Sequence, residues 1–170
     1  MIRKKRTFWK CISWVIMFTL FSAGFASLNR AGEVSTTIGN KSLPKDGFKV
    51  SIIIEKLPRS LKPNQIFYIP VKLKNIGNSF WPAVGQPDNT YRVTFSYHWL
   101  SFNGKMAIPN GLRTYLPHDI QKGEEVTLDA IIEAPEIKGV YILEFDMVQE
   151  KIAWFKDKGS QTTKIEVRVE

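Results

Sequence analysis

The chain has 170 residues, of which 44% are hydrophobic, and it carries a formal net charge of +8 with a single cysteine. This length and apolar content describe one globular domain with an attached segment. They exclude a disordered chain, which would hold fewer apolar residues, and a small disulfide-stapled protein, which would need several cysteines. Only one apolar run approaches the thickness of a bilayer, so a protein with several membrane spans is excluded as well.

Residues 1–26 have the pattern of an export signal. They contain five basic side chains and no acidic one, and the basic end is followed by an uncharged, mostly apolar run. Gly24 and Ala26 are the small residues that a signal peptidase requires, which predicts cleavage after Ala26. Extended to residues 8–26, the run also fits an uncleaved single-pass anchor. In both cases we expect the rest of the chain to be exported, either secreted or held on the outer face of the cytoplasmic membrane.

The basic charge belongs mainly to this leader. Without residues 1–26 the chain has 19 basic and 16 acidic side chains. It also shows no basic stripe with interleaved aromatic residues, so nucleic-acid binding is not expected. Cys11 lies in the leader without the small residues of a lipobox before it, which argues against a lipid anchor. Cleavage of the leader leaves no cysteine, which excludes disulfides and thiolate metal sites in the mature chain.

The next 21 positions, residues 27–47, are polar and contain three glycines and one proline. They show no apolar period, which predicts a flexible linker ahead of a domain at residues 48–170.

Apolar residues alternate with polar ones throughout the predicted domain, as is typical of half-exposed β-strands. Asn103-Gly104 is the strongest hairpin signal, because both residues tolerate positive φ. Pro70, which lacks a backbone N–H, would make the strand at residues 66–75 a poor edge for pairing with another strand, and Lys72 and Lys74 would add to this effect. We therefore predict an all-β, immunoglobulin-like antiparallel β-sandwich of about seven strands. The apolar stripes lie at residues 50–54, 67–73, 91–99, 126–132, 141–147 and 165–169.

Several motifs follow one another in a fixed order over residues 50–170. They are Asn75-x-Gly77 with Phe80-Trp81-Pro82, the run Ser96-Tyr97-His98-Trp99-Leu100, Gly111-Leu112-Arg113-Thr114-x-Leu116-Pro117, Gly139-x-Tyr141-x-Leu143, and Asp146-x-Val148-x-Glu150 with Trp154-Phe155. This set resembles a bacterial immunoglobulin-like module found in exported proteins and beside enzymes of surface-glycan biosynthesis. It is also similar in outline to the four-tryptophan domain of autophagy cargo receptors, through the N-x-G-x-x-x-W turn. The resemblance implies a binding or accessory role and brings no catalytic residues.

The fifth stripe resembles strand F of immunoglobulin domains in particular. Tyr141 stands where those domains place the tyrosine corner, and Leu143 stands where they place a cysteine. Trp99 or Phe95 would then be the aromatic residue of strand C that packs between the sheets.

Catalysis and metal binding find little support in the sequence. Ser96 and His98 share the outward face of one strand, and His118 and Asp119 lie together in a loop. A Ser-His-Asp hydrolase needs such groups to converge beside an oxyanion site, and the chain has no nucleophile elbow or glycine-rich oxyanion turn. No close histidine pair or carboxylate cluster suggests a metal. We expect no enzyme, no cofactor and no metal.

The candidate ligand-binding residues are Trp81, His98, Arg113, Asp146 and Trp154. One interpretation makes Arg113 and Asp146 an ion pair that holds the turn at Gly111 against strand F. The other makes them polar groups of a ligand groove in which Trp81 or Trp154 offers a flat face to a sugar. Each tryptophan can equally be a core residue.

Two functions remain open from the sequence. The first is recognition of envelope or extracellular carbohydrate by an exported, non-catalytic module, which requires exposed tryptophans. The second is docking on a protein of the cell envelope, to which the edges of an open sandwich lend themselves.

Overall fold

A computed structural model describes residues 36–170, and the predicted leader and the first part of the predicted linker lie outside that range. No helix within the range is long and apolar enough to cross a membrane. The elements are ten strands and two short 3-10 helices: η1 (Lys45–Gly47), β1 (Val50–Ile54), β2 (Ser60–Leu61), β3 (Ile66–Asn75), β4 (Val93–Ser101), β5 (Met106–Ile108), β6 (Thr114–Tyr115), β7 (Glu125–Glu133), β8 (Gly139–Gln149), β9 (Ala153–Trp154), η2 (Lys156–Lys158) and β10 (Thr163–Val169).

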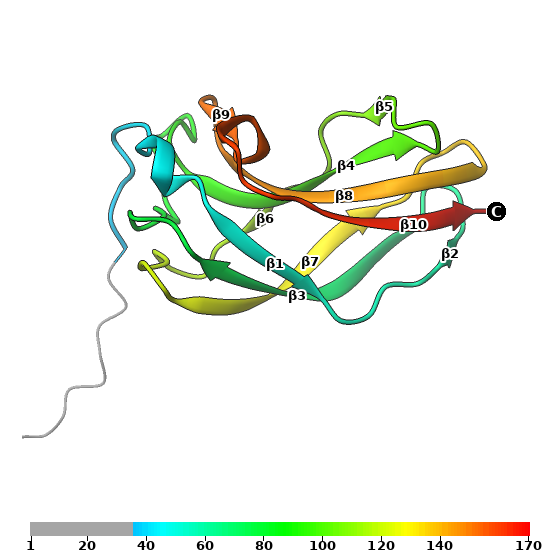
Figure 1. The fold of residues 1–170 in the computed structure, drawn as a ribbon, viewed down its shortest axis with the longest axis horizontal. Coiled ribbons are helices and arrows are strands. Elements are labelled where there is room, and N and C mark those ends of the chain that lie inside the picture. The colour runs from blue at the N-terminus through cyan, green and yellow to red at the C-terminus, as the bar shows by residue number, and fades with distance from the viewer. Residues whose placement is uncertain (1–35) are drawn as a thin grey trace, which may run out of the picture. The chain divides into compact units, whose positions relative to one another are not determined.

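The strands form two sheets that face each other (Figure 1). The smaller sheet has the order β1-β3-β7, and the larger has the order β2-β10-β8-β4-β5, with β6 paired to β4 and β9 paired to β8. All pairs are antiparallel except β10 with β2. The six predicted stripes correspond to the six long strands, so the predicted all-β sandwich is confirmed, and the four remaining strands are short additions.

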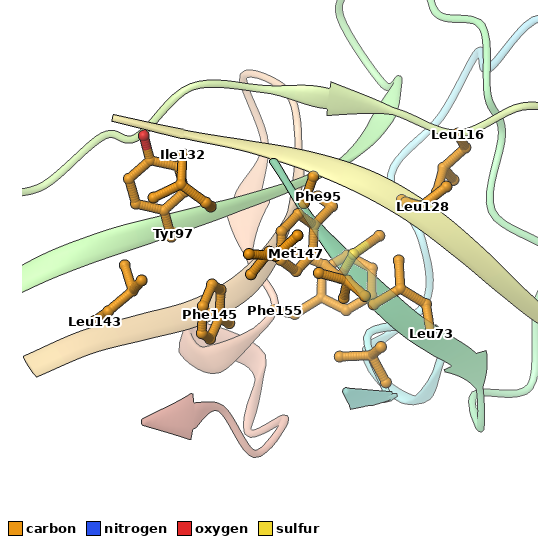
Figure 2. Packing of buried hydrophobic residues seen from close by; sticks show 14 of the residues in the cluster. Leu73, Phe95, Tyr97, Leu116, Leu128, Ile132, Leu143, Phe145, Met147 and Phe155 are labelled. Carbon is orange, nitrogen blue, oxygen red and sulfur yellow. The ribbon is translucent and has the colours of Figure 1, made fainter. Parts of the chain in front are cut away.

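The inward-facing residues of both sheets make one apolar core (Figure 2). Phe95 of β4 stacks on Phe145 of β8 with ring centroids 5.9 Å apart, and Trp99 meets Tyr141 edge to face at 6.0 Å. Trp99 and Leu143 are paired across the two strands and are both fully buried. This is the place where an immunoglobulin domain has its tryptophan and a disulfide cysteine, and here leucine fills it with apolar volume.

The tyrosine corner is present. The Tyr141 hydroxyl donates a hydrogen bond of 2.8 Å to the carbonyl oxygen of Ile137, four residues upstream. That contact fixes the connection between the two sheets at the start of β8, as it does at the start of strand F in immunoglobulin domains. Together with the sheet order, it identifies the fold as immunoglobulin-like.

The Asn75-x-Gly77 motif and Trp81 are explained by packing between loops. The Asn75 amide donates to the carbonyl oxygens of Ser79 and Ile120 at 2.9 and 3.0 Å, and its oxygen accepts the Gly77 N–H at 3.0 Å. Trp81 has no exposed surface, and its indole N–H donates to the Gly47 carbonyl oxygen at 3.0 Å. The motif therefore builds the end of the sandwich, and Trp81 belongs to the core.

The predicted hairpin at Asn103-Gly104 joins β4 and β5, but its turn differs from the expected one. Gly104 alone has positive φ, at 81°, and its N–H donates to the Ser101 carbonyl oxygen at 2.8 Å. The Asn103 side chain instead accepts hydrogen bonds from the Ser101 hydroxyl and the Lys105 N–H. A loop that ends on one left-handed glycine needs only that residue to be free of a Cβ.

β3, the strand that Pro70 would blunt as an edge, is the middle strand of its sheet, between β1 and β7. Its pairing with β1 covers only the second half of the strand, from the Ile54–Val71 pair to the Val50–Asn75 pair. Pro70 comes directly before that half, where β3 has a neighbour on one side only. The missing N–H of Pro70 is thus tolerated in the middle strand of a sheet.

The flexible linker expected at residues 27–47 does not extend over residues 36–47, which pack on the domain. Ile38 forms a parallel bridge with Val84, and Leu43 is buried with its N–H donated to the Gln149 side chain at 2.9 Å. Asp119 holds this segment from the other side, because its carboxylate accepts the N–H groups of Thr37 and Ala83. Tertiary hydrogen bonds, which a local composition pattern does not reveal, order this polar segment.

Candidate binding site on the outer face of the larger sheet

Four of the five candidate residues from the sequence meet on the outer face of β4 and β8. The register pairs Ser96 with Asp146 and His98 with Glu144, so alternation brings two polar pairs to one face. Arg113 reaches them from the loop before β6, and Trp154 reaches them from β9. Trp81, the fifth candidate, lies elsewhere in the core. We call His98, Asp146, Ser96, Arg113, Glu150 and Trp154 the Trp154 cluster.

His98 has the predicted outward phase but is not exposed. Only 2% of the residue is accessible, because Trp154 lies over it with ring centroids 4.1 Å apart. Its Nδ1 lies 2.5 Å from the Pro109 carbonyl oxygen, which can only accept, so Nδ1 carries a proton. Its Nε2 faces Asp146 Oδ2 at 4.0 Å, too long for a hydrogen bond, and has no other partner among the described residues.

Asp146 is fully buried on the neighbouring strand. Its carboxylate accepts the N–H of Met147 at 2.8 Å and the N–H of Lys156 at 3.2 Å. Burial raises the pKa of Asp146, and this effect outweighs His98 and the two backbone N–H groups, which lower it. The carboxyl group therefore holds its proton to a higher pH than an exposed aspartate does.

Arg113 pairs with Glu150 and not with Asp146, which corrects the predicted ion pair. Arg113 Nε donates to Glu150 Oε1 at 2.7 Å, while Nη1 donates to Ser96 Oγ at 3.0 Å and to the Gly111 carbonyl oxygen at 2.9 Å. The role expected for the pair still applies, since Arg113 holds the turn at Gly111 against the sheet. Glu150 lies one residue beyond β8 and continues the alternation phase of Glu144 and Asp146.

Trp154 covers the cluster. It lies over His98, and the Arg113 guanidinium carbon is 4.9 Å from its ring centroid. Its side chain is only partly exposed. A cation over an indole ring is a stabilising contact, and here it occupies ring surface that a sugar would need.

Glu144 is a polar residue of this face that the sequence did not single out. It is 5% exposed and accepts hydrogen bonds of 2.9 Å from both Lys156 and Thr162, with Lys164 at 3.2 Å. Burial would raise its pKa, but the bonds from Lys156 and Thr162 and the nearby Lys164 outweigh that effect and lower the pKa. The sequence feature that could have identified Glu144 is its alternation phase, because it lies two residues before Asp146 in β8 and points to the same face.

The arrangement of these groups is not that of a hydrolase. The Ser96 hydroxyl lies 3.1 and 3.0 Å from the carbonyl oxygens of Gly111 and Leu112 and accepts a hydrogen bond from Arg113. His118 pairs instead with Glu124 in a separate loop, at 2.6 Å. Within residues 36–170 no group of three potential ligand side chains is placed to hold a metal ion. The cluster is a largely internal polar network whose accessible rim is formed by Trp154, Arg113 and Glu150.

A second surface lies on the outer face of the smaller sheet. Ile66 and Tyr68 of β3 are 56% and 66% exposed, and Pro70 follows with the same phase. Ile131 of β7 stands opposite Tyr68 in the register. We call these four residues the Tyr68 face. This apolar group lies beside the half of β3 that β1 does not cover, and the exposed Glu133 and Asp129 of β7 flank it opposite Ile66 and Pro70.

The comparisons with known proteins concern the fold alone. The sequence matches no family profile and no curated protein. Among solved structures, the chain is similar to part of a β-glucosidase from Listeria innocua, with 12% identity and a TM-score of 0.44 over 71% of this chain and 16% of that one. It is also similar to a CARDB domain from Pyrococcus furiosus, with 16% identity and a TM-score of 0.40 over 72% and 86% of the two chains. The sporulation control protein Spo0M from Bacillus subtilis matches with 15% identity and a TM-score of 0.42, over 72% of this chain and 49% of that protein.

Proposed function

We propose that this protein is an exported, non-catalytic binding module at the cell surface that docks on a protein of the cell envelope. The observation that carries the proposal is the Tyr68 face, where exposed apolar side chains gather on one sheet. Contiguous apolar surface on a domain of this size marks an interaction site more often than chance exposure does. The export pattern of residues 1–26 supports the location, and the resemblance of the ordered motifs to an exported bacterial module supports an accessory role.

The tryptophans favour a protein partner over a sugar. Trp81 and Trp99 have no exposed surface, and their indole N–H groups donate to the carbonyl oxygens of Gly47 and Glu133. Trp81, the tryptophan of the N-x-G-x-x-x-W turn, therefore packs loops together in this chain. A carbohydrate platform needs an accessible ring face, and among the tryptophans of residues 36–170 only Trp154 retains part of one.

Site-specific photo-crosslinking in the native cell tests the proposal. A photoreactive phenylalanine analogue replaces Tyr68 in the full chain, and the matched control carries it at Tyr115, which is 59% exposed on another part of the surface. We expect one protein adduct from position 68, reduced by the additional change Ile131→Ser, and none from position 115. Equal adducts from both positions, or a folded protein that captures nothing at position 68, would contradict the proposal.

Carbohydrate binding at the rim of the Trp154 cluster is the second candidate. It is favoured by the grouping of a partly exposed indole with the paired Arg113 and Glu150 side chains, which can hydrogen-bond hydroxyl groups. Titration of the purified chain with envelope and plant polysaccharides by calorimetry tests it. Binding that Trp154→Phe preserves and both Trp154→Ala and Glu150→Gln abolish would favour this candidate. A flat response from folded protein across the panel would remove it.

A further inference from the structure

The first half of β3 has a free backbone edge beside the Tyr68 face. The N–H and C=O of Asn75 point toward β7, because they bond to the Glu124 and Gly123 backbone, whereas the Ile76 N–H bonds to Lys49 on the β1 side. The register of β3 with β7 runs without a shift from residue 66 to residue 74. Since strand residues alternate in direction, the backbone groups of Ile66, Tyr68 and Pro70 point toward the β1 side.

No strand of the described chain pairs with residues 66–70 on that side, because β1 ends opposite Val71. Ile66 and Tyr68 thus offer two N–H donors, and Ile66, Tyr68 and Pro70 offer three carbonyl acceptors. Such a row of unpaired groups is a template for an added strand.

A groove runs along this free edge. The crossover from β1 to β2 passes at a distance from β3 and leaves a hollow of about 650 Å³, lined by Leu57, Tyr68, Ile69 and Ile165 among others. A second hollow of about 390 Å³ adjoins it and shares Arg59 and Ile165 with the first. The apolar lining suits side chains that would point inward from an added strand.

The rim of the groove carries more basic than acidic side chains. The linings of the two hollows contain three basic residues, Lys56, Arg59 and Arg168, and two acidic residues, Glu55 and Glu166. Within residues 36–170 none of the five forms a salt bridge. Arg59 and Arg168 are neighbours, since the Arg168 N–H donates to the Arg59 carbonyl oxygen at 2.9 Å. Both arginines line the second hollow, and a guanidinium group without a carboxylate partner is complementary to a carboxylate of a ligand.

We propose that this groove binds an extended acidic segment of a partner protein, which adds as a strand beside Ile66 and Tyr68. Apolar side chains of the segment enter the groove, and its carboxylates meet Arg59 and Arg168. The inference rests on the proposed function, because it assigns the part of the partner that the Tyr68 face and its edge recognise. A peptide fits better than an acidic glycan, because a peptide backbone alternates the donors and acceptors that the free edge requires.

Amide hydrogen exchange of the full chain, measured by NMR in detergent, tests the inference. The probe is a capped decapeptide of alternating valine and glutamate. We expect it to slow exchange at Ile66 and Tyr68 by about tenfold or more, without changing Asn75, whose N–H is already bonded. A peptide with lysine in place of glutamate, and a glutamate peptide that is N-methylated at alternate residues, should not protect these amides.

Charge reversal provides the matched variants. Arg59→Glu with Arg168→Glu should abolish protection by the glutamate peptide, whereas Lys105→Glu with Lys122→Glu, two exposed lysines elsewhere, should leave it unchanged. Absence of protection at saturating peptide, or equal protection by the lysine peptide, overturns the inference. So does binding of polygalacturonate that depends on Arg59 and Arg168 while the two amides stay unprotected, since the groove would then be a glycan site. If the Tyr68 crosslink persists while the amides remain unprotected, protein docking stands and strand addition falls.

Discussion

Gly111→Ala should destabilise the fold by overpacking the ring of Tyr97. A Cβ at position 111 would lie 2.5 Å from Cε2 of that ring, whereas ordinary contacts begin at 3.4 Å. The ring would therefore have to move by about 0.9 Å. The surrounding core and a hydrogen bond restrain this ring, because Tyr97 is 1% exposed and its hydroxyl accepts the Glu133 N–H at 2.8 Å.

The expected cost combines two effects. Inserting a methyl group into a packed site costs about 1–3 kcal/mol, and weakening the buried hydrogen bond to Glu133 adds about 1 kcal/mol. We therefore expect a loss of roughly 2–4 kcal/mol in the free energy of unfolding. Gly111 also accepts a hydrogen bond from Arg113, so the same change should loosen the Trp154 cluster.

Urea unfolding followed by tryptophan fluorescence measures this cost. Gly104→Ala is the matched control, because a Cβ there meets nothing within 4 Å and the cost of about 1 kcal/mol comes only from its φ of +81°. The additional change Tyr97→Leu should cancel most of the penalty of Gly111→Ala, since the shorter side chain frees the space. A Gly111→Ala variant as stable as the wild type, or a penalty that persists in the Tyr97→Leu background, would refute the packing argument.

Three further variants probe the buried polar groups. Asp146→Asn removes a buried carboxyl group with a raised pKa. The raised pKa stabilises the fold below the ordinary value of 3.8, and this contribution is lost as the pH rises through the folded pKa. The stability difference between wild type and variant should therefore fall with rising pH, and a constant difference would contradict this. Glu144→Gln should show the opposite trend, because hydrogen bonds, first among them that from Lys156, outweigh burial and lower the pKa of Glu144. The resulting stability is present above the ordinary pKa of 4.5 and is lost as the pH falls. Thermal unfolding between pH 3 and 7 measures the trend for both variants. Asn75→Ala should cost about 2 kcal/mol in urea, because it leaves the Gly77 N–H and the Ser79 carbonyl oxygen without partners, whereas the Ile120 carbonyl oxygen keeps its bond from the Trp81 N–H. A loss below about 1 kcal/mol would show that water replaces the amide.

Local pattern was sufficient for the sandwich, and the resemblance to strand F of immunoglobulin domains indicated the tyrosine corner. Alternation of apolar residues identifies the buried face of each long strand, because a strand exposes successive side chains to opposite sides. Tyr141 was assigned by that resemblance, and its hydrogen-bond partner, Ile137, is four residues upstream. The same periodicity assigned His98 and Asp146 to one outer face, although they are 48 positions apart in the chain.

Burial on that outer face could not be read from the pattern. Alternation says which way a side chain points, and it says nothing about what covers it. His98 points outward and is buried because Trp154 lies over it, and Arg113 bonds to Glu150, directly after β8, and not to Asp146. Contacts between such turns depend on the path of the chain through three dimensions.

The sequence by itself determined the fold class, the strand faces and the expectation of export, because each depends on composition or on a short-range period. Only the tertiary structure decided that Trp81 is a core residue, that residues 36–47 belong to the domain, and that β3 has one free half-edge. Those features depend on which segments meet after the chain has crossed between the sheets, and the physical terms involved are burial and hydrogen bonding between distant residues.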